Sequence, residues 1–273
     1  MKYISIVFGA VLFAGLTASA QYRLEYKINS SSPLHYKAHS TLETIQSMMG
    51  QEAKVSATSD ESISVIGKTT GGELVYDMKV DSSENLVIMP SGDTTRTSSP
   101  VVGKVREVRI HPDGEEISSR WVDTTFAGSQ AGQMREFTSF FFKLPTKEVS
   151  KGSTWSQEKV DTVSTPAGGG KIIVNTNTSY ELIDEEVVDG ANCARISFNG
   201  KVALNGSTEA QGVNVNIAGN GAISGTALFD SEKGRIVKIN GKSDQKLMMT
   251  SAGQNGMSMP MTQATSYDLS LVK

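Results

Sequence analysis

The sequence predicts an all-β protein made of two similar curved antiparallel sheets, or half-barrels, with one phenylalanine-rich helix near the middle. Apolar and polar residues alternate over most of the 273-residue chain, and this is the period of a strand with one buried face. Valine, threonine, serine and glycine are frequent, and convincing helical repeats are few. Short motifs of Gly, Asn, Asp and Pro separate the alternating runs and indicate tight turns.

Residues 1–20 have the pattern of a signal peptide. Lys2 precedes an apolar run, Ile4 to Leu16, that is too short to cross a bilayer. The small-x-small site Ala18–Ala20 follows and predicts cleavage after its last residue, so that the mature chain begins at Gln21. We therefore expect an exported protein, periplasmic or extracellular, with no transmembrane segment in the mature chain.

The N-terminal half, residues 21–145, is predicted to consist mainly of strands. Residues 22–28 alternate apolar and charged side chains, which indicates a strand with one wet face. Tyr36–Val55 is expected to form one long strand that bends at Gly50. Residues 111–114 read His-Pro-Asp-Gly and predict a hairpin turn, because proline fixes φ and glycine supplies a positive φ. The other expected strands are Ser62–Ile66, Glu73–Val80, Leu86–Met89, Lys104–Ile110 and Glu115–Arg120.

The segment between Phe126 and Leu144 interrupts the strand pattern and predicts the only substantial helix. Its apolar side chains recur at the spacing of one helix face: Met134, Phe137, Phe140, Phe141 and Leu144. Pro145 ends the run. So many large rings on one short segment must be buried, and we expect them to pack against the open or concave side of a sheet.

The C-terminal half, residues 146–273, is predicted to be all strand and turn. A faint internal repeat relates it to the first half, because apolar and glycine positions align at a nearly constant offset. If this repeat is real, two similar curved sheets pair or face each other. The expected strands are Thr154–Val163, Lys171–Ile183, Glu186–Phe198, Lys201–Ile217, Gly221–Phe229, Gly234–Met249 and Ser258–Val272.

Two motifs raise the question of metal binding. His35, His39 and Glu43 are spaced four apart, but on a strand successive members lie about 13 Å apart, too far to share one ion. Three alternating methionines near the C-terminus have the soft thioether sulfur that Cu(I) prefers: Met257, Met259 and Met261. The alternative is that these methionines fill an irregular apolar interior or line an adaptable cavity, and we prefer this interpretation.

Composition argues against several functional classes. The formal net charge is −3 with both signs scattered, whereas nucleic-acid and anionic-membrane binding need clustered lysine and arginine. Cys193 is the only cysteine, which excludes an internal disulfide and fits a small core residue. No nucleophile elbow, catalytic cysteine–histidine spacing or dinucleotide-binding loop is present. We expect neither an enzyme nor a bound cofactor or metal.

Several motifs together resemble a family of uncharacterised secreted β-rich proteins from Gram-negative bacteria, and the likeness covers nearly all of the mature chain. They are Tyr22-x-Leu24-x-Tyr26-Lys27, Met48-Met49-Gly50-Gln51-Glu52, Leu144-Pro145 followed by Lys151-Gly152-Ser153-Thr154-Trp155, Phe229-Asp230 with Gly234, and Met259-Pro260-Met261-x-Gln263. The family has no assigned activity, so the resemblance implies export and a β architecture. At the level of architecture alone, the chain resembles lipoprotein carriers, which are curved half-barrels closed by helices over an apolar cavity.

These expectations lead to one leading function and one rival. The leading function is a non-enzymatic binding protein that holds an apolar or lipid-like ligand, or an envelope partner, on a curved sheet. The candidate ligand-lining residues are Met134, Phe137, Phe140, Phe141, Met257, Met259 and Met261. The rival is a structural or interaction module whose interior is fully packed, with no small-molecule ligand.

Overall fold

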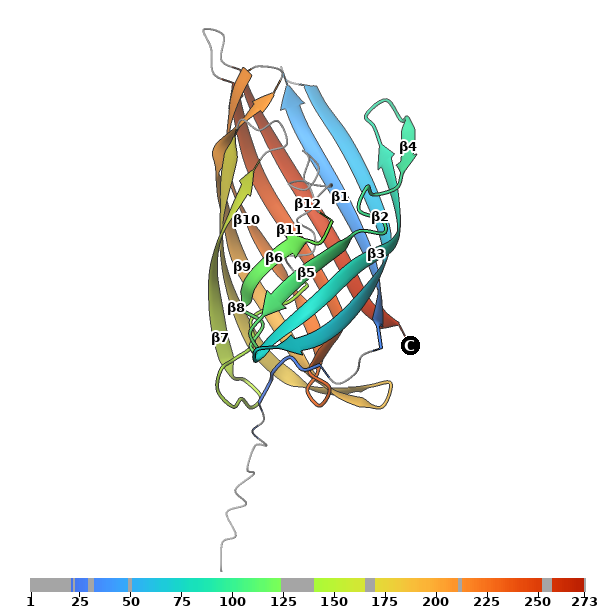
Figure 1. The fold of residues 1–273 in the computed structure, drawn as a ribbon. Coiled ribbons are helices and arrows are strands. Elements are labelled where there is room, and N and C mark those ends of the chain that lie inside the picture. The colour runs from blue at the N-terminus through green and yellow to red at the C-terminus, as the bar shows by residue number, and fades with distance from the viewer. Residues whose placement is uncertain are drawn as a thin grey trace, which may run out of the picture.

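The computed structural model describes residues 21, 23–28, 32–48, 51–123, 140–164, 170–210, 213–251 and 257–272. Within these ranges the chain forms twelve strands and no helix. All twelve belong to one open, strongly curved sheet with a concave and a convex face (Figure 1). The strands are β1 (Leu34–Met48), β2 (Gln51–Thr70), β3 (Glu73–Ile88), β4 (Thr94–Thr97), β5 (Val105–Ile110), β6 (Glu116–Trp121), β7 (Thr154–Ser164), β8 (Lys171–Val188), β9 (Ala191–Ala210), β10 (Val213–Asp230), β11 (Arg235–Ser251) and β12 (Ser258–Val272).

The two halves of the chain form one continuous sheet, so the prediction of two curved sheets or half-barrels is wrong. The strand order is β6-β5-β3-β2-β1-β12-β11-β10-β9-β8-β7, and β4 pairs with β3. β1 and β12 pair antiparallel from His35↔Val272 to Gln46↔Met261. This long ladder satisfies the backbone groups of both strands, which two separate sheets would leave exposed at their edges. The all-β class itself is confirmed.

The segment that was expected to be one bent strand is a hairpin. β1 pairs along its whole length with residues 51–65 of β2, from Leu34 opposite Val65 to Met48 opposite Gln51. Met49 and Gly50 lie outside the described residues. A hairpin lets the two segments satisfy each other's N–H and C=O groups, and a single bent strand would need a separate partner for each part.

The predicted helix between Phe126 and Leu144 is also wrong for the part that the structure describes. Residues 124–139, which include Met134 and Phe137, lie outside the described residues, and Phe140–Leu144 has no helical structure. The Tyr26 hydroxyl donates to the Phe142 carbonyl and accepts from the Phe142 N–H, and the Leu144 N–H donates to the Asp113 carbonyl. These backbone groups therefore bond to distant parts of the chain instead of closing helical turns.

The N-terminal segment 23–28 crosses one end of the sheet and does not join it. Tyr26 N–H donates to the Pro112 carbonyl at 2.7 Å, and Lys27 N–H donates to the Gly234 carbonyl at 3.0 Å. Leu24 and Tyr26 are buried. The alternation of this segment was interpreted as a strand, but it reflects extended backbone that covers the core with one face.

The concave face holds the hydrophobic core, and its side chains alternate with charged residues on the convex face. The largest fully buried side chains are Phe229, Leu24, Met78, Ile110, Leu144, Leu182, Ile196 and Ile236.

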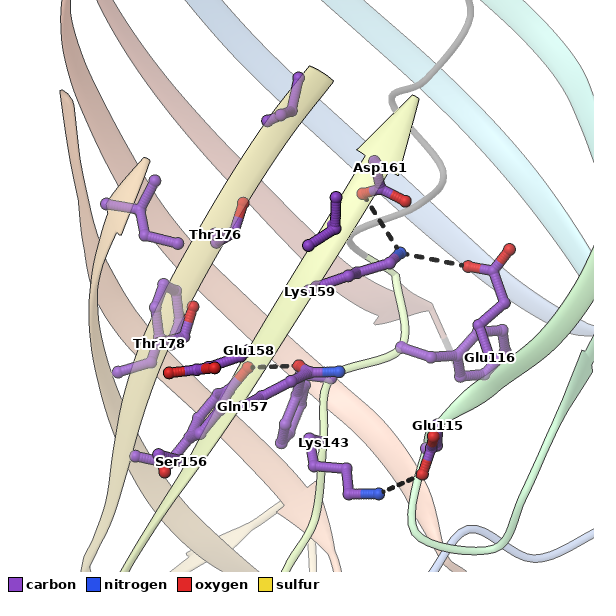
Figure 2. A pocket seen from close by; sticks show the side chains of 18 of the residues that line it. Glu115, Glu116, Lys143, Ser156, Gln157, Glu158, Lys159, Asp161, Thr176 and Thr178 are labelled. Atoms are coloured by element: carbon purple, nitrogen blue, oxygen red, sulfur yellow. Dashed lines mark hydrogen bonds and ion pairs between the residues drawn. The ribbon is translucent and has the colours of Figure 1, made fainter. Parts of the chain in front are cut away.

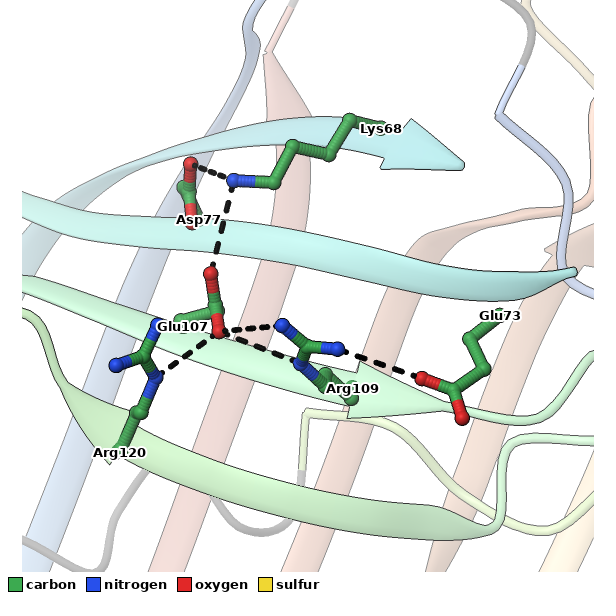
Figure 3. Close-up of polar contacts among 6 residues, drawn as sticks. All are labelled: Lys68, Glu73, Asp77, Glu107, Arg109 and Arg120. Carbon is green, nitrogen blue, oxygen red and sulfur yellow. Dashed lines mark hydrogen bonds and ion pairs between the residues drawn. The ribbon is translucent and has the colours of Figure 1, made fainter. Parts of the chain in front are cut away.

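Figure 3 shows the convex side of β2, β3, β5 and β6, where polar side chains form a network around Glu107. Glu107 accepts from Arg120 at 3.0 Å and from Arg109 at 3.3 Å, and Lys68 Nζ lies 3.6 Å away. The hydrogen bond from Arg120, reinforced by Arg109, lowers the pKa of Glu107.

Two glycines allow aromatic rings to lie flat on the concave face. A Cβ on Gly225 of β10 would come within 2.5 Å of Phe198 Cζ, and a Cβ on Gly241 of β11 would collide with the Tyr267 ring. Phe198 lies opposite Gly225, Gly225 opposite Gly241, and Gly241 opposite Tyr267. The missing side chains thus give room for the rings and relieve crowding on the inside of the curve.

Candidate functional site

The concave face encloses a cavity of about 810 Å³. Its lining comes from β5–β12, from Gly114 and Glu115 of the β5–β6 turn, and from the segment Phe141–Lys143 (Figure 2). The inward-facing register brings the deep wall together: Tyr180 of β8 lies opposite Phe198 of β9, and Val202 of β9 lies opposite Gly221 of β10. The deep wall is mainly hydrocarbon and aromatic, and the hydroxyls of Thr176 and Thr178 are part of it. Its apolar residues are Val174, Tyr180, Phe198, Val202, Ile223, Ile239 and Tyr267.

Phe141, Phe142 and Lys143 form the floor of this cavity, and the three consecutive rings of Phe140–Phe142 point to different neighbours. The Phe140 ring meets Tyr36 edge-on at 5.0 Å between centroids, and Phe141 lies 4.7 Å from Tyr76. Phe142 stacks near Tyr180 at 6.1 Å. The irregular backbone allows the three successive rings to reach these different neighbours. In a helix, successive side chains would instead be fixed about 100° apart around one axis.

β6 and β7, the two ends of the sheet order, both line the cavity, and we refer to the gap between these two strands as its mouth. Lys159 of β7 reaches across: its Nζ lies 3.5 Å from Glu116 Oε2 on β6 and 3.6 Å from Asp161 Oδ2 (Figure 2). All three side chains are roughly 26–30 % exposed. The seam between the two edges is therefore bridged here by side chains, since β6 and β7 share no strand pairing in the described part of the chain.

A second lysine fixes the floor segment to the β5–β6 turn. Lys143 Nζ lies 2.7 Å from both Asp113 Oδ2 and Glu115 Oε2. Partial burial by itself would lower the pKa of Lys143, but the hydrogen bonds to the two carboxylates outweigh it and raise that pKa. Burial would likewise raise the pKa of Asp113, and Lys143 together with the Glu115 N–H lowers it instead. Both lysines that line the cavity, Lys143 and Lys159, are thus paired with carboxylates.

The structure separates the candidate ligand-lining residues into two groups. Phe140 is buried and contacts Phe141, which lines the cavity, with 5.0 Å between ring centroids. Met259 and Met261 are half-buried on β12, whereas Met257 precedes the strand and is 47 % exposed. Met261 accepts a 3.7 Å hydrogen bond from the Gln46 side chain. None of the three methionines is among the described residues that line the 810 Å³ cavity, and Met134 and Phe137 lie outside the described residues.

Sequence reasoning missed most of the cavity wall. Tyr180, Phe198 and Tyr267 were assigned to strands but not to a site, and Lys143 and Lys159 were not singled out. The available signal was strand alternation, which predicts that Phe198 and Val202 share one face with Gly200 between them. Strand alternation identifies the inward-facing residues of each strand, but only the register across β7–β12 shows which of them lie side by side in one cavity wall.

The His35, His39 and Glu43 motif lies on the outside, and each of its side chains bonds to a different neighbour. His39 is exposed and pairs with Asp60 at 2.8 Å, His35 bonds to the Ser64 hydroxyl, and Glu43 pairs with Lys54. The described ranges contain no group of three or more histidine, cysteine, aspartate or glutamate side chains placed to hold an ion. Nor do they contain a helix with the length and hydropathy needed to span a membrane.

Comparison with known proteins gives one family match and distant structural likenesses. The model of a family of unknown function (DUF6263) matches residues 129–236, which agrees in outline with the expected resemblance to an uncharacterised family. No curated protein matches the chain. The similar solved structures are OccK5 (OpdH) of Pseudomonas aeruginosa (5% identity, 89% of this chain and 99% of that chain, TM-score 0.29), OccK2 (OpdF) of the same organism (7%, 89% and 98%, 0.27), and OmpF of Salmonella typhi in complex with daunomycin (7%, 89% and 100%, 0.25). We base no conclusion on likenesses with such low TM-scores.

Proposed function

We propose that this chain is an exported, non-enzymatic binding protein that holds an apolar or lipid-like ligand in the cavity of its curved sheet. The observation that carries the proposal is the 810 Å³ cavity, which has a size typical of small-molecule sites. Its deep wall is mainly aromatic and aliphatic, and its charged lining residues all come from β5–β7 and the segments between these strands, as an amphipathic ligand requires. The rival function is a module with a fully packed interior, and it predicts no cavity of this size.

Two features support binding rather than catalysis. The charged side chains at the mouth are already engaged with one another: Lys159 with Glu116 and Asp161, and Lys143 with Asp113 and Glu115. Along β8–β12 the lining is mainly hydrocarbon, with two threonine hydroxyls, and offers burial of apolar area to a ligand.

Export is proposed from the N-terminal sequence alone. The apolar run and the site ending at Ala20 are those of a cleaved signal peptide. N-terminal sequencing of the protein recovered from the cell envelope or medium should begin at Gln21 or its cyclised form. A recovered protein that still begins at Met1 would contradict export by this route.

Titration with N-phenyl-1-naphthylamine, which fluoresces in apolar sites, tests the binding function. Wild type should bind the probe saturably. Val202→Phe, which adds volume to the concave wall, should weaken binding by at least about tenfold. The matched control is Lys201→Phe, one residue away on the convex face, which should bind like wild type. Absent saturation in wild type, or equal weakening by both variants, would contradict a ligand site in this cavity.

A further inference from the structure

Two cavities on the concave side of the sheet have Tyr267 in both of their linings. A second cavity, of about 240 Å³, lies against β1, β2 and β12 next to Phe140. Tyr267 and Ile239 line both this small chamber and the 810 Å³ chamber. We propose that Tyr267 is the partition that sets how long a ligand chain the protein accepts. This inference rests on the proposed function and adds the residue that determines ligand length.

The register of the sheet explains why the partition stands where it does. Tyr267 lies between Gly241 of β11 and Ser40 of β1, and Ser40 lies opposite Ser59 of β2. A Cβ on Gly241 would collide with Tyr267 ring atoms, so the ring leans over β11. The side chains on its other flank, Ser40 and Ser59, are small and line the 240 Å³ chamber. The Tyr267 ring lies toward Gly241, and the small chamber is therefore the space on its other side, next to Ser40 and Ser59.

The large chamber ends against the same ring. Phe198 leans over Gly225 from the opposite side, and its row across the sheet continues through Gly225 and Gly241 to Tyr267. Burial raises the pKa of Tyr267 to about 12, so its hydroxyl stays neutral at ordinary pH and the wall carries no charge. Removal of this ring would join the two chambers into one longer space, lined mainly by apolar groups and, in the small chamber, also by Glu61.

The proposal is tested by measuring how binding affinity depends on the length of the ligand's alkyl chain. Each additional buried methylene should strengthen binding by roughly fourfold while the chamber has room, and the gain should stop when the chain reaches Tyr267. In Tyr267→Ala the gain should continue to longer chains. Tyr267→Phe keeps the ring and should keep the wild-type limit. In Tyr267→Ala combined with Ala38→Leu, the added side chain fills the small chamber and should restore the shorter limit.

The experiment is displacement of bound N-phenyl-1-naphthylamine by 1-alkanols of increasing chain length. Tyr267→Leu serves as a smaller perturbation if Tyr267→Ala does not give a folded protein by circular dichroism. A longer limiting chain in Tyr267→Ala or Tyr267→Leu, but not in Tyr267→Phe, supports the partition. The same limiting chain in all variants overturns it while leaving the proposed function intact. A wild type that binds neither probe nor alkanol overturns the proposed function itself.

Discussion

At the scale of single residues, Tyr26 connects three distant parts of the chain. Its ring is buried against Phe141 and Phe229, with centroids 5.4 and 5.2 Å away. Its hydroxyl satisfies both backbone groups of Phe142, a residue 116 positions away in the chain. Burial raises the pKa of Tyr26 well above its usual value, so the hydroxyl remains a donor at any ordinary pH.

Tyr26→Phe tests this role. The ring stays, but the Phe142 N–H and C=O lose their partner inside the protein, and each unsatisfied buried group is costly. We predict a loss of about 1–3 kcal/mol in the free energy of unfolding, measured by urea denaturation. Tyr76→Phe is the control, since no hydrogen bond of its hydroxyl is seen among the described residues. Equal losses in the two variants would contradict the account.

Glu107 makes stability depend on pH. Its hydrogen bond from Arg120, with that from Arg109, lowers the folded-state pKa below the unfolded value of about 4.3. Glu107 therefore stabilises the folded chain above that value, and this contribution is lost as the pH falls through the lower folded pKa. The urea midpoint of wild type should fall more steeply below about pH 5 than that of Glu107→Gln. Parallel profiles would show that Glu107 has no such role.

At the scale of elements, sequence reasoning succeeded where one strand carries its own signal. The alternation in residues 73–80 and 171–183 predicted strands that the structure contains within β3 and β8. It failed where long-range contacts decide the backbone. Phe137, Phe140, Phe141 and Leu144 have helical spacing, yet Tyr26 and Asp113 take up the backbone groups of residues 142 and 144. The cavity was beyond prediction for the same reason, because its wall depends on pairing between strands far apart in sequence.

The curvature of β10 and β11 depends on glycine at two positions. In Gly225→Ala the new methyl meets Phe198 and the Asn240 carbonyl, and in Gly241→Ala it meets the Tyr267 ring. We predict that each variant loses about 1–3 kcal/mol in the free energy of unfolding, as overpacked sites do. Ser224→Ala, the outward neighbour of Gly225, should change stability by less than about 0.5 kcal/mol. Thermal unfolding of the three variants measures these losses. Equal losses of stability in all three would contradict the account.

At the scale of the whole molecule, the sheet is a single curved layer whose two end strands face each other across the cavity mouth. Backbone ladders connect all neighbours from β6 around to β7, and the described link between those two ends is the Lys159–Glu116 ion pair. The seam should therefore be the part of the wall that opens most easily, because opening it breaks no strand ladder.

Lys159→Glu tests the seam as the route of ligand exchange. The variant places a carboxylate beside Glu116 and Asp161, and their repulsion should favour the open mouth. We predict probe release roughly fivefold faster in stopped-flow measurements, an effect of about 1 kcal/mol that salt should reduce. Lys54→Glu breaks a similar pair with Glu43, but between the paired strands β1 and β2, and should leave release unchanged. If the rate of probe release were unchanged in both variants, the ligand would not exchange through this seam.

The central claim is that the cavity holds an apolar ligand, and native mass spectrometry of the protein purified from its own host tests it most directly. Wild type should carry a bound species of defined mass that organic solvent extracts, and Val202→Phe purified in parallel should carry less of it while Lys201→Phe carries the same amount. The contradictory result is a bare polypeptide mass in wild type, or an equal load in wild type and Val202→Phe.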